Sequence, residues 1–165
     1  MNQKVFELAA VNTAPLGLVI EGQKERFSAG HQYLFVIIPF GRVVIEDPSK
    51  YLERSAYTKL ALLGYKPLVN STGTRHKTLQ IRIDSLQASA FDFLFFRRVV
   101  ARVSLGASLK DGLGNEIAEV TADASHASVR KYGFHTELEY ALDKSFSAAL
   151  SDLFEQLGLG AVADI

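Results

Sequence analysis

The sequence contains no cysteine. Disulfides, thiolate metal ligands, cysteine nucleophiles and a lipid-bearing N-terminal cysteine are therefore absent from the chain. Exported proteins that fold without disulfides also lack cysteine, so this absence alone does not decide between the cytoplasm and the periplasm.

Long apolar runs are missing as well, since none approaches the roughly 20 residues that a membrane-spanning helix requires. The first stretch, MNQKVFELAAVNTAPLGLVI, has a single early lysine and no sustained apolar region, so as it stands it is not a signal peptide. We expect the chain as given to be soluble. Contact with a membrane would come only through a lipid anchor that this chain lacks.

Neither sign of charge predominates, because 18 acidic side chains balance 18 basic ones. The charge balance gives no reason to expect nucleic acid as a partner. With 165 residues, 48% of them apolar, the chain suits one globular domain with a substantial core. We predict a single domain over residues 1–165, with an extended N-terminal arm (1–31) laid against an α+β core (32–158).

The run QYLFVIIPF, residues 32–40, is rich in β-branched and aromatic residues and ends near Pro39 and Gly41. Such a run is typical of a strand buried within a domain. A helix follows it, because Asp47 is a suitable N-cap, Pro48 suits the first helical position, and Gly64 suits a left-handed C-terminal residue. We therefore predict a buried strand over 32–40 and a helix from 47 to 64.

Alternating patterns predict three further strands. In TLQIRIDSL, Leu79, Ile81 and Ile83 share one face; a longer strand runs on to Leu109, with alternate residues from Val99 facing the core. The segment KDGLGN is expected to close a hairpin, and its Asp111, Asn115 and Glu116 are better explained by a turn than by a cation site. The return strand EIAEVTADASHASV carries small residues that suit a helix packed closely on it.

Thr136 can cap a final helix that extends to about Leu157. Its leucines, alanine and Phe146 form a wide apolar stripe, while Glu137, Glu139 and other charged residues form the solvent side. The order of elements predicts an α+β fold: an antiparallel (mixed) sheet with a long β-hairpin and two helices packed on one face.

Catalytic and metal-binding motifs are not recognisable in the sequence. The four histidines are scattered, and no glycine-rich phosphate loop or nucleophile elbow occurs. Asp84 and Asp92 flank the gap between two predicted strands, where an acid pair could transfer protons only if a cleft joined them; solvated loop acids are the favoured interpretation. We predict no catalytic residue, no metal and no cofactor.

The segment FDFLFFRR, Phe91 to Arg98, is the candidate interaction site. Extending the register of the long strand backwards places Phe93 and Phe95 on the core face, and Arg97 at the sheet margin where it must be paired or snorkel. The opposite face presents apolar side chains rimmed by arginines, a composition typical of protein contact sites. The predicted protein-binding residues are Leu94, Phe96, Arg98, Val100 and Arg102; the alternative is that the N-terminal arm covers this face.

An Asp-Pro helix that ends in Gly-Tyr, in DPSKYLERSAYTKLALLGYKPL, is followed by LQIRIDSL, a long hairpin broken at DGLGN, and a closing amphipathic helix. Over residues 32–158 this order resembles small bacterial outer-membrane lipoproteins, namely YajG-like proteins and related uncharacterised envelope lipoproteins. Their strand-helix-strand unit is similar to the N-terminal domain of TolB. The resemblance implies an exported accessory domain at the outer membrane; the missing N-terminal cysteine departs from that pattern.

Three functions follow from these observations. The first is a non-catalytic, periplasm-facing accessory protein that binds envelope proteins or forms homo-oligomers. The second is a small-molecule carrier or enzyme with a pocket between sheet and helices, where the alanines of the return strand leave room. The third is a cytoplasmic accessory domain of a phage or mobile element.

Overall fold

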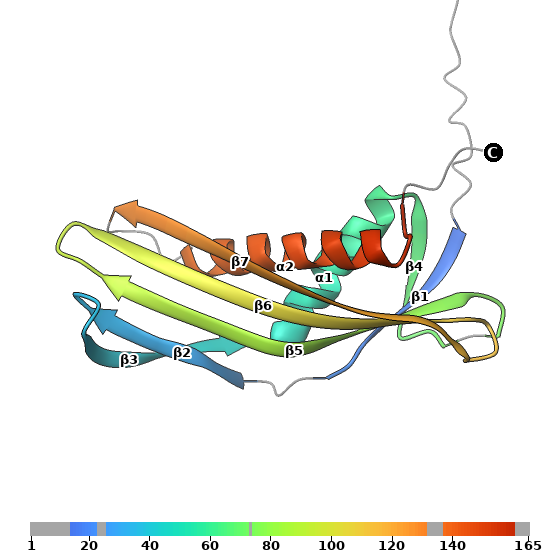
Figure 1. Cartoon of the computed structure of the whole chain (residues 1–165), viewed down its shortest axis with the longest axis horizontal. Coiled ribbons are helices and arrows are strands. Elements are labelled where there is room, and N and C mark those ends of the chain that lie inside the picture. The colour runs from blue at the N-terminus through green and yellow to red at the C-terminus, as the bar shows by residue number, and fades with distance from the viewer. Residues whose placement is uncertain (1–13, 23–25, 73, 132–136, 161–165) are drawn as a thin grey trace, which may run out of the picture.

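A computed structural model describes residues 14–22, 26–72, 74–131 and 137–160. These residues form a curved sheet with both helices on one side of it (Figure 1). The elements are β1 (Ala14–Ile20), β2 (Arg26–Leu34), β3 (Ile38–Glu46), α1 (Pro48–Leu62), β4 (Tyr65–Val69), β5 (Lys77–Asp92), β6 (Phe96–Lys110), β7 (Glu116–Lys131) and α2 (Glu137–Gln156).

The three longest strands, β5, β6 and β7, pair antiparallel along their whole length. The other edge of β5 is shared: β1 pairs in parallel with its first half, and β2 pairs in parallel with its last residues. β4 and β3 then extend the sheet beyond β1 and β2. The predicted α+β fold, with a mixed sheet, a long hairpin and two helices, is confirmed.

The predicted N-terminal arm, where the structure describes it, forms strands of the sheet instead of an extended segment laid against it. β1 lies inside the sheet between β4 and β5, and its Leu16 and Leu18 are buried in the core. β2 crosses the predicted boundary at residue 31 without a break. The sequence PLGLVI is too short to indicate whether its strand lies at the edge or in the centre of a sheet. The central position of β1 depends on its pairing with a strand on each side. Residues 1–13 lie outside the described part.

The predicted buried strand over residues 32–40 is wrong. This run is the end of β2, a turn at residues 35–37 and the start of β3, and most of its apolar side chains are exposed. The predicted gap after LQIRIDSL is also absent, because β5 continues to Asp92. The first difference arises because an apolar run was taken as buried, although sequence hydrophobicity alone does not tell a core from an exposed turn. The second arises because an irregularity between Ile83 and Ser85 shifts the alternation within one continuous strand.

The helix starts and turns follow the predicted capping chemistry. The Asp47 side chain accepts a hydrogen bond from the backbone N–H of Lys50 at 3.3 Å, and Gly64 adopts φ 88° after the helix. In the β6–β7 turn, Asp111 Oδ1 accepts from the backbone N–H groups of Leu113 and Asn115, so this segment is the predicted hairpin turn.

The core lies between the helices and the inner face of the sheet. α2 packs on β6 and β7, and Ser145 Oγ donates to the backbone oxygen of Ala101 at 3.2 Å, which holds the helix close to β6. Phe146 is fully buried at this contact layer. Glu137, predicted on the solvent side of α2, is only 3% exposed. The predicted cap Thr136 lies outside the described residues.

Candidate functional site

Two hairpin turns lie side by side at one end of the sheet. The parallel register of β2 and β5 places Leu34 opposite Asp92, the last residues of the two strands. The ladder continues into the first turn, where the Phe35 N–H donates to the Asp92 backbone oxygen at 2.9 Å. The β2–β3 turn and the β5–β6 turn therefore share this end, at the left of Figure 1.

Both turns present large apolar side chains to solvent. The most exposed are Ile37 at 78% and Phe95 at 80%. We name the whole group the apolar tip: it consists of Phe35, Val36, Ile37, Ile38, Phe40, Leu94, Phe95 and Phe96. Scattered exposed apolar residues are normal on a protein surface, whereas a gathered group of this kind marks an interaction site.

The β2–β3 turn has an unfavourable backbone for its residues. Phe35 and Val36 have φ angles of 52° and 73°, and the Ile37 N–H donates to the Leu34 oxygen at 3.3 Å. Positive φ at both central residues is the mark of a type I′ turn, where Asn-Gly is strongly favoured. A positive φ is especially unfavourable for a β-branched residue such as Val36. Folding stability alone would select other residues here.

A buried carboxylate joins the two hairpins behind the tip. Asp92 is 4% exposed, and it accepts hydrogen bonds from Arg97 Nε and Nη2 and, at 2.7 Å, from Gln32 Nε2 of β2. Burial acts to raise the pKa of Asp92, but the hydrogen bonds and the positive charge of Arg97 outweigh it and lower this pKa below its usual value. The predicted pairing of Arg97 at the sheet margin is thus confirmed.

Asp84 and Asp92 are neither loop acids, as the sequence favoured, nor the acid pair that was considered as an alternative. Asp84 and Asp92 both belong to β5, and they bind different cations: Asp84 Oδ1 lies 2.8 Å from Arg82 Nε, while Asp92 pairs with Arg97. The two carboxylates therefore do not form an acid pair across a gap. Among the described residues, no group of three or more histidine, aspartate and glutamate side chains is placed to hold a metal ion.

The five predicted contact residues fall on two adjoining surfaces. Leu94 and Phe96 belong to the apolar tip, and Leu94 is 71% exposed. Arg98, Val100 and Arg102 point from β6 to the face of the sheet opposite the helices, which we name the outer face. There they line a hollow of 380 Å³ together with side chains of β5, among them Gln87, Ser89 and Phe91.

The predicted register fails in the turn. Phe95 was expected in the core, yet it is 80% exposed because the chain reverses at residues 93–95 before β6 begins. Phe93 is partly buried and stacks on Phe96, with ring centroids 4.4 Å apart. Sequence reasoning missed the other half of the tip, residues 35–40. The available signal was Pro39 and Gly41 close behind an apolar run, which also fits a hairpin.

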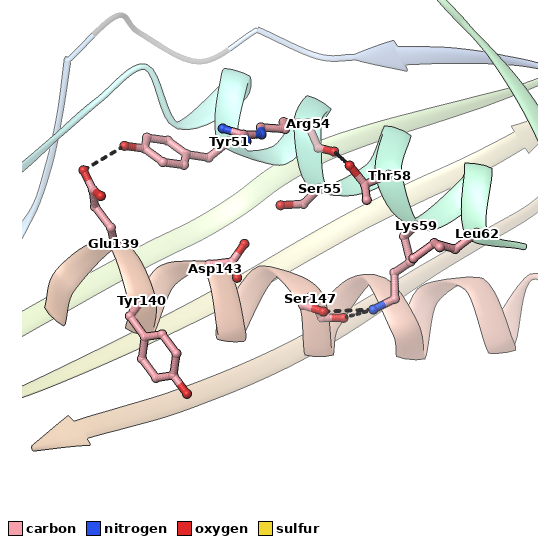
Figure 2. A pocket seen from close by; sticks show the side chains of 10 residues that line it. All are labelled: Tyr51, Arg54, Ser55, Thr58, Lys59, Leu62, Glu139, Tyr140, Asp143 and Ser147. Atoms are coloured by element: carbon pink, nitrogen blue, oxygen red, sulfur yellow. Dashed lines mark hydrogen bonds between the residues drawn. The ribbon is translucent and has the colours of Figure 1, made fainter. Parts of the chain in front are cut away.

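A second hollow, of 620 Å³, lies between the two helices (Figure 2). Tyr51 and Lys59 of α1 point towards α2, where the Tyr51 hydroxyl donates to Glu139 at 3.5 Å and Lys59 Nζ donates to the backbone oxygen of Ser147 at 2.8 Å. Burial lowers the pKa of Lys59, against the nearby negative charge of Asp143. The lining side chains come from the two helices alone, so this is not the predicted pocket between sheet and helices.

No protein family model matches the sequence, and no curated protein matches it either. Among solved structures, an uncharacterised protein is similar with a TM-score of 0.52 at 10% identity, over 87% of this chain and 92% of that chain. A DUF330 protein from Xanthomonas campestris gives a TM-score of 0.49 at 15% identity, over 90% and 82%. A minor lipoprotein from Acinetobacter baumannii gives 0.47 at 12% identity, over 87% and 91%.

The superposition with a TM-score of 0.52 shows a shared fold. Bacterial lipoproteins are among the other structures that are similar to this chain. At such low identity the likeness concerns the arrangement of sheet and helices, and no functional residue is carried over from it.

Proposed function

We propose that this protein is a non-catalytic, lipoprotein-like accessory protein of the bacterial cell envelope, of the YajG-like kind that its sequence resembles. It faces the periplasm at the outer membrane and binds another envelope protein, or a second copy of itself, through the outer face of β6. The observation that carries the proposal is the exposure of Leu94, Phe96, Arg98 and Arg102 beside the half-buried Val100.

Composition supports a protein partner for this face. Arginine and phenylalanine are enriched at protein interfaces, and binding energy concentrates where such side chains become fully desolvated. The register places Arg98 opposite Phe91 and Val100 opposite Ser89 on β5, with Val129 and Ala127 opposite them on β7. The result is a shallow surface of apolar and small side chains with arginines at its margin.

The described part of the N-terminal region supports this reading too. β1 lies within the sheet, paired on both edges, and so occupies a place other than the outer face. The sheet face that carries the helices is already buried by α2. The outer face is therefore the side of β6 on which a binding partner could bury side chains that are exposed in the monomer.

The test is the double variant Phe96→Asp with Arg98→Glu. Replacing an aromatic by a carboxylate and reversing a charge should abolish partner binding and self-association, both measured by sedimentation velocity and by crosslinking from a photoreactive residue placed at Val100. The control is Leu62→Asp on α1, because Leu62 is 82% exposed and distant from this face. If a folded double variant still associates and crosslinks as the parent does, the proposed interface is wrong.

The location is tested separately by fractionating a bacterium that produces the protein from its own gene. We expect it in the outer-membrane fraction. Recovery in the cytoplasm would overturn the proposed location and leave the interface test unaffected.

A further inference from the structure

The apolar tip lies at the end of the sheet and not on one of its faces, so we consider its binding partner separately from that of the outer face. We propose that the apolar tip inserts into the interface of a bilayer that contains anionic lipids, with the cations behind it contacting the headgroups. This inference goes beyond the proposed function: the tip would bring the protein onto a membrane without an attached lipid, and only Val100 and Arg102 of the proposed protein contact would lie outside the membrane-binding end.

The first argument is the chemistry of the side chains. The eight residues of the tip are phenylalanine, leucine, isoleucine and valine, and none carries a polar side-chain atom. Protein contact sites of soluble partners mix aromatic residues with arginine, tyrosine and other hydrogen-bonding groups. A group without any such atoms matches acyl chains better than a polar protein surface.

The second argument is the backbone. A turn that enters an apolar phase must satisfy its own N–H and C=O groups, because the bilayer offers no partner for them. The Ile37 N–H donates to the Leu34 oxygen, the Phe35 N–H donates to the Asp92 oxygen, and the Phe93 N–H donates to the Phe96 oxygen. Both turns thus carry hydrogen bonds within the protein, which lowers the cost of inserting them.

The third argument is charge. No acidic residue occurs in residues 34–42 and 93–100, which form the two turns and the adjoining strand ends, or in residues 124–130 of β7. Two carboxylates at this end are buried: Asp92, which pairs with Arg97, and Glu137 at the start of α2, which is 3% exposed. Exposed Arg42 and Arg98 follow the two turns along β3 and β6. This end of the molecule is therefore positive and complementary to anionic headgroups.

The depth of these cations fits an interfacial position. Arg98 lies three residues beyond Phe95, a span of about 10 Å along an extended chain. Amphipathic protein segments bury their apolar side chains about 5–10 Å into the boundary between headgroups and acyl chains. With Phe95 at that depth, Arg98 would lie at the level of the phosphates. None of the helices formed by the described residues has the length and apolar character to cross a membrane.

The fourth argument is the strain of the β2–β3 turn. Phe35 and Val36 occupy backbone conformations that favour asparagine and glycine, and their side chains are 45% and 50% exposed. Neither the turn nor the core of the described structure gains from apolar residues here. Unfavourable conformations of this kind cluster at functional sites, and insertion into lipid gives these two side chains a function.

The test uses the absence of tryptophan from the sequence. Phe95→Trp places a single fluorescent reporter in the tip, and Leu113→Trp places one in the β6–β7 turn at the opposite end of the hairpin, where Leu113 is 82% exposed. With vesicles of phosphatidylethanolamine and phosphatidylglycerol, the emission of F95W should shift to the blue and be quenched by brominated acyl chains. The emission of L113W should not change.

Binding strength is measured by sedimentation of the unmodified chain with the same vesicles. Because the chain has no cysteine, binding cannot come from a lipid attached to one. Ile37→Asp and Phe95→Asp should each weaken binding by roughly tenfold or more, since each withdraws a large apolar side chain from the bilayer. Arg98→Gln should weaken it about fivefold, and only with anionic lipid. Leu113→Asp should leave it unchanged.

Neither Ile37 nor Phe95 is a predicted contact residue of the outer face, so the two proposals can fail separately. Equal binding of the parent, I37D and F95D to vesicles would overturn the insertion, as would an F95W spectrum that vesicles leave unchanged. A blue shift of F95W with protein concentration alone would show that a second copy covers the tip, and would overturn it too. Loss of folding in I37D is detected by circular dichroism, and Ile37→Ser then replaces it.

Discussion

Phe146 and Phe95 represent two regions of the molecule. Phe146 of α2 is 1% exposed in the layer between helix and sheet, whereas Phe95 is 80% exposed at the end of the same sheet. Both belong to apolar stretches of sequence. The difference teaches that a large apolar side chain is buried in one region and exposed to solvent in the other, and that only the neighbours of a side chain decide which.

The helix-covered region is built to bury its side chains completely. Along β6, alternate residues from Val99 to Leu109 face the helices and are at most 4% exposed. Burial of this kind is the main favourable contribution to folding. In the tip region, by contrast, the apolar side chains are exposed to water, and two residues adopt unfavourable backbone conformations. The same substitution made in each region should therefore have very different effects on stability.

The largest effect is expected for Phe146→Ala. Removal of a fully buried aromatic side chain leaves a cavity and should lower the free energy of unfolding by about 4 kcal/mol. The matched change, Phe95→Ala, should alter it by less than about 0.5 kcal/mol, because Phe95 is almost entirely in water. Urea denaturation of both variants measures this. Similar losses for the two would refute the division into a folding region and an interaction region.

An intermediate effect is expected for Asp92→Asn, which lies between the regions. Removing the charge leaves the guanidinium of Arg97 without its carboxylate and should destabilise the protein by about 2 kcal/mol at neutral pH. The pKa of Asp92 is lowered in the folded state, so its stabilising contribution is present above the unfolded pKa of about 3.9 and is lost as pH falls through the folded pKa.

Denaturation curves at several pH values test this lowered pKa of Asp92. The difference between the parent and D92N should be constant from neutral pH down to about pH 5 and should shrink towards more acidic pH. Asp152→Asn, at an exposed position of α2, serves as a comparison for general acid effects. A gap between parent and D92N that stays constant at acidic pH would contradict the assigned role of Asp92.

The smallest effect, and one of opposite sign, is expected for the double change Phe35→Asn with Val36→Gly. Asn-Gly suits positive φ at both central residues, so the free energy of unfolding should rise by about 1 kcal/mol. Vesicle binding should fall at the same time, because two apolar side chains leave the tip. A variant that is less stable than the parent would refute the backbone argument. A variant that is more stable but binds vesicles as the parent does would refute a role of these two side chains in binding.

Part of the fold could be predicted from local sequence. The helix that begins after Asp47 and the turn at Asp111 depend on hydrogen bonds between residues three or four apart, so the amino acids present at those positions decide them. The alternation of Leu79, Ile81 and Ile83 likewise determines one face of β5. These features use short-range chemistry, which a sequence shows directly.

The candidate site was predicted only in part. Leu94, Phe96, Arg98 and Arg102 are exposed as expected, but Phe95 was placed in the core because the strand register was extended through a turn. The contribution of residues 35–40 was not recognised, since nothing in their sequence says that they meet residues 93–96 across about sixty positions.

The sequence by itself determined that this protein has an α+β fold with two amphipathic helices, a long hairpin and a balanced charge, because periodicity and capping act locally. Only the tertiary structure decided that two apolar runs would lie side by side in water. The reason is physical: the parallel pairing of Leu34 with Asp92 brings the two turns together, and the helices that could cover apolar side chains pack elsewhere on the sheet.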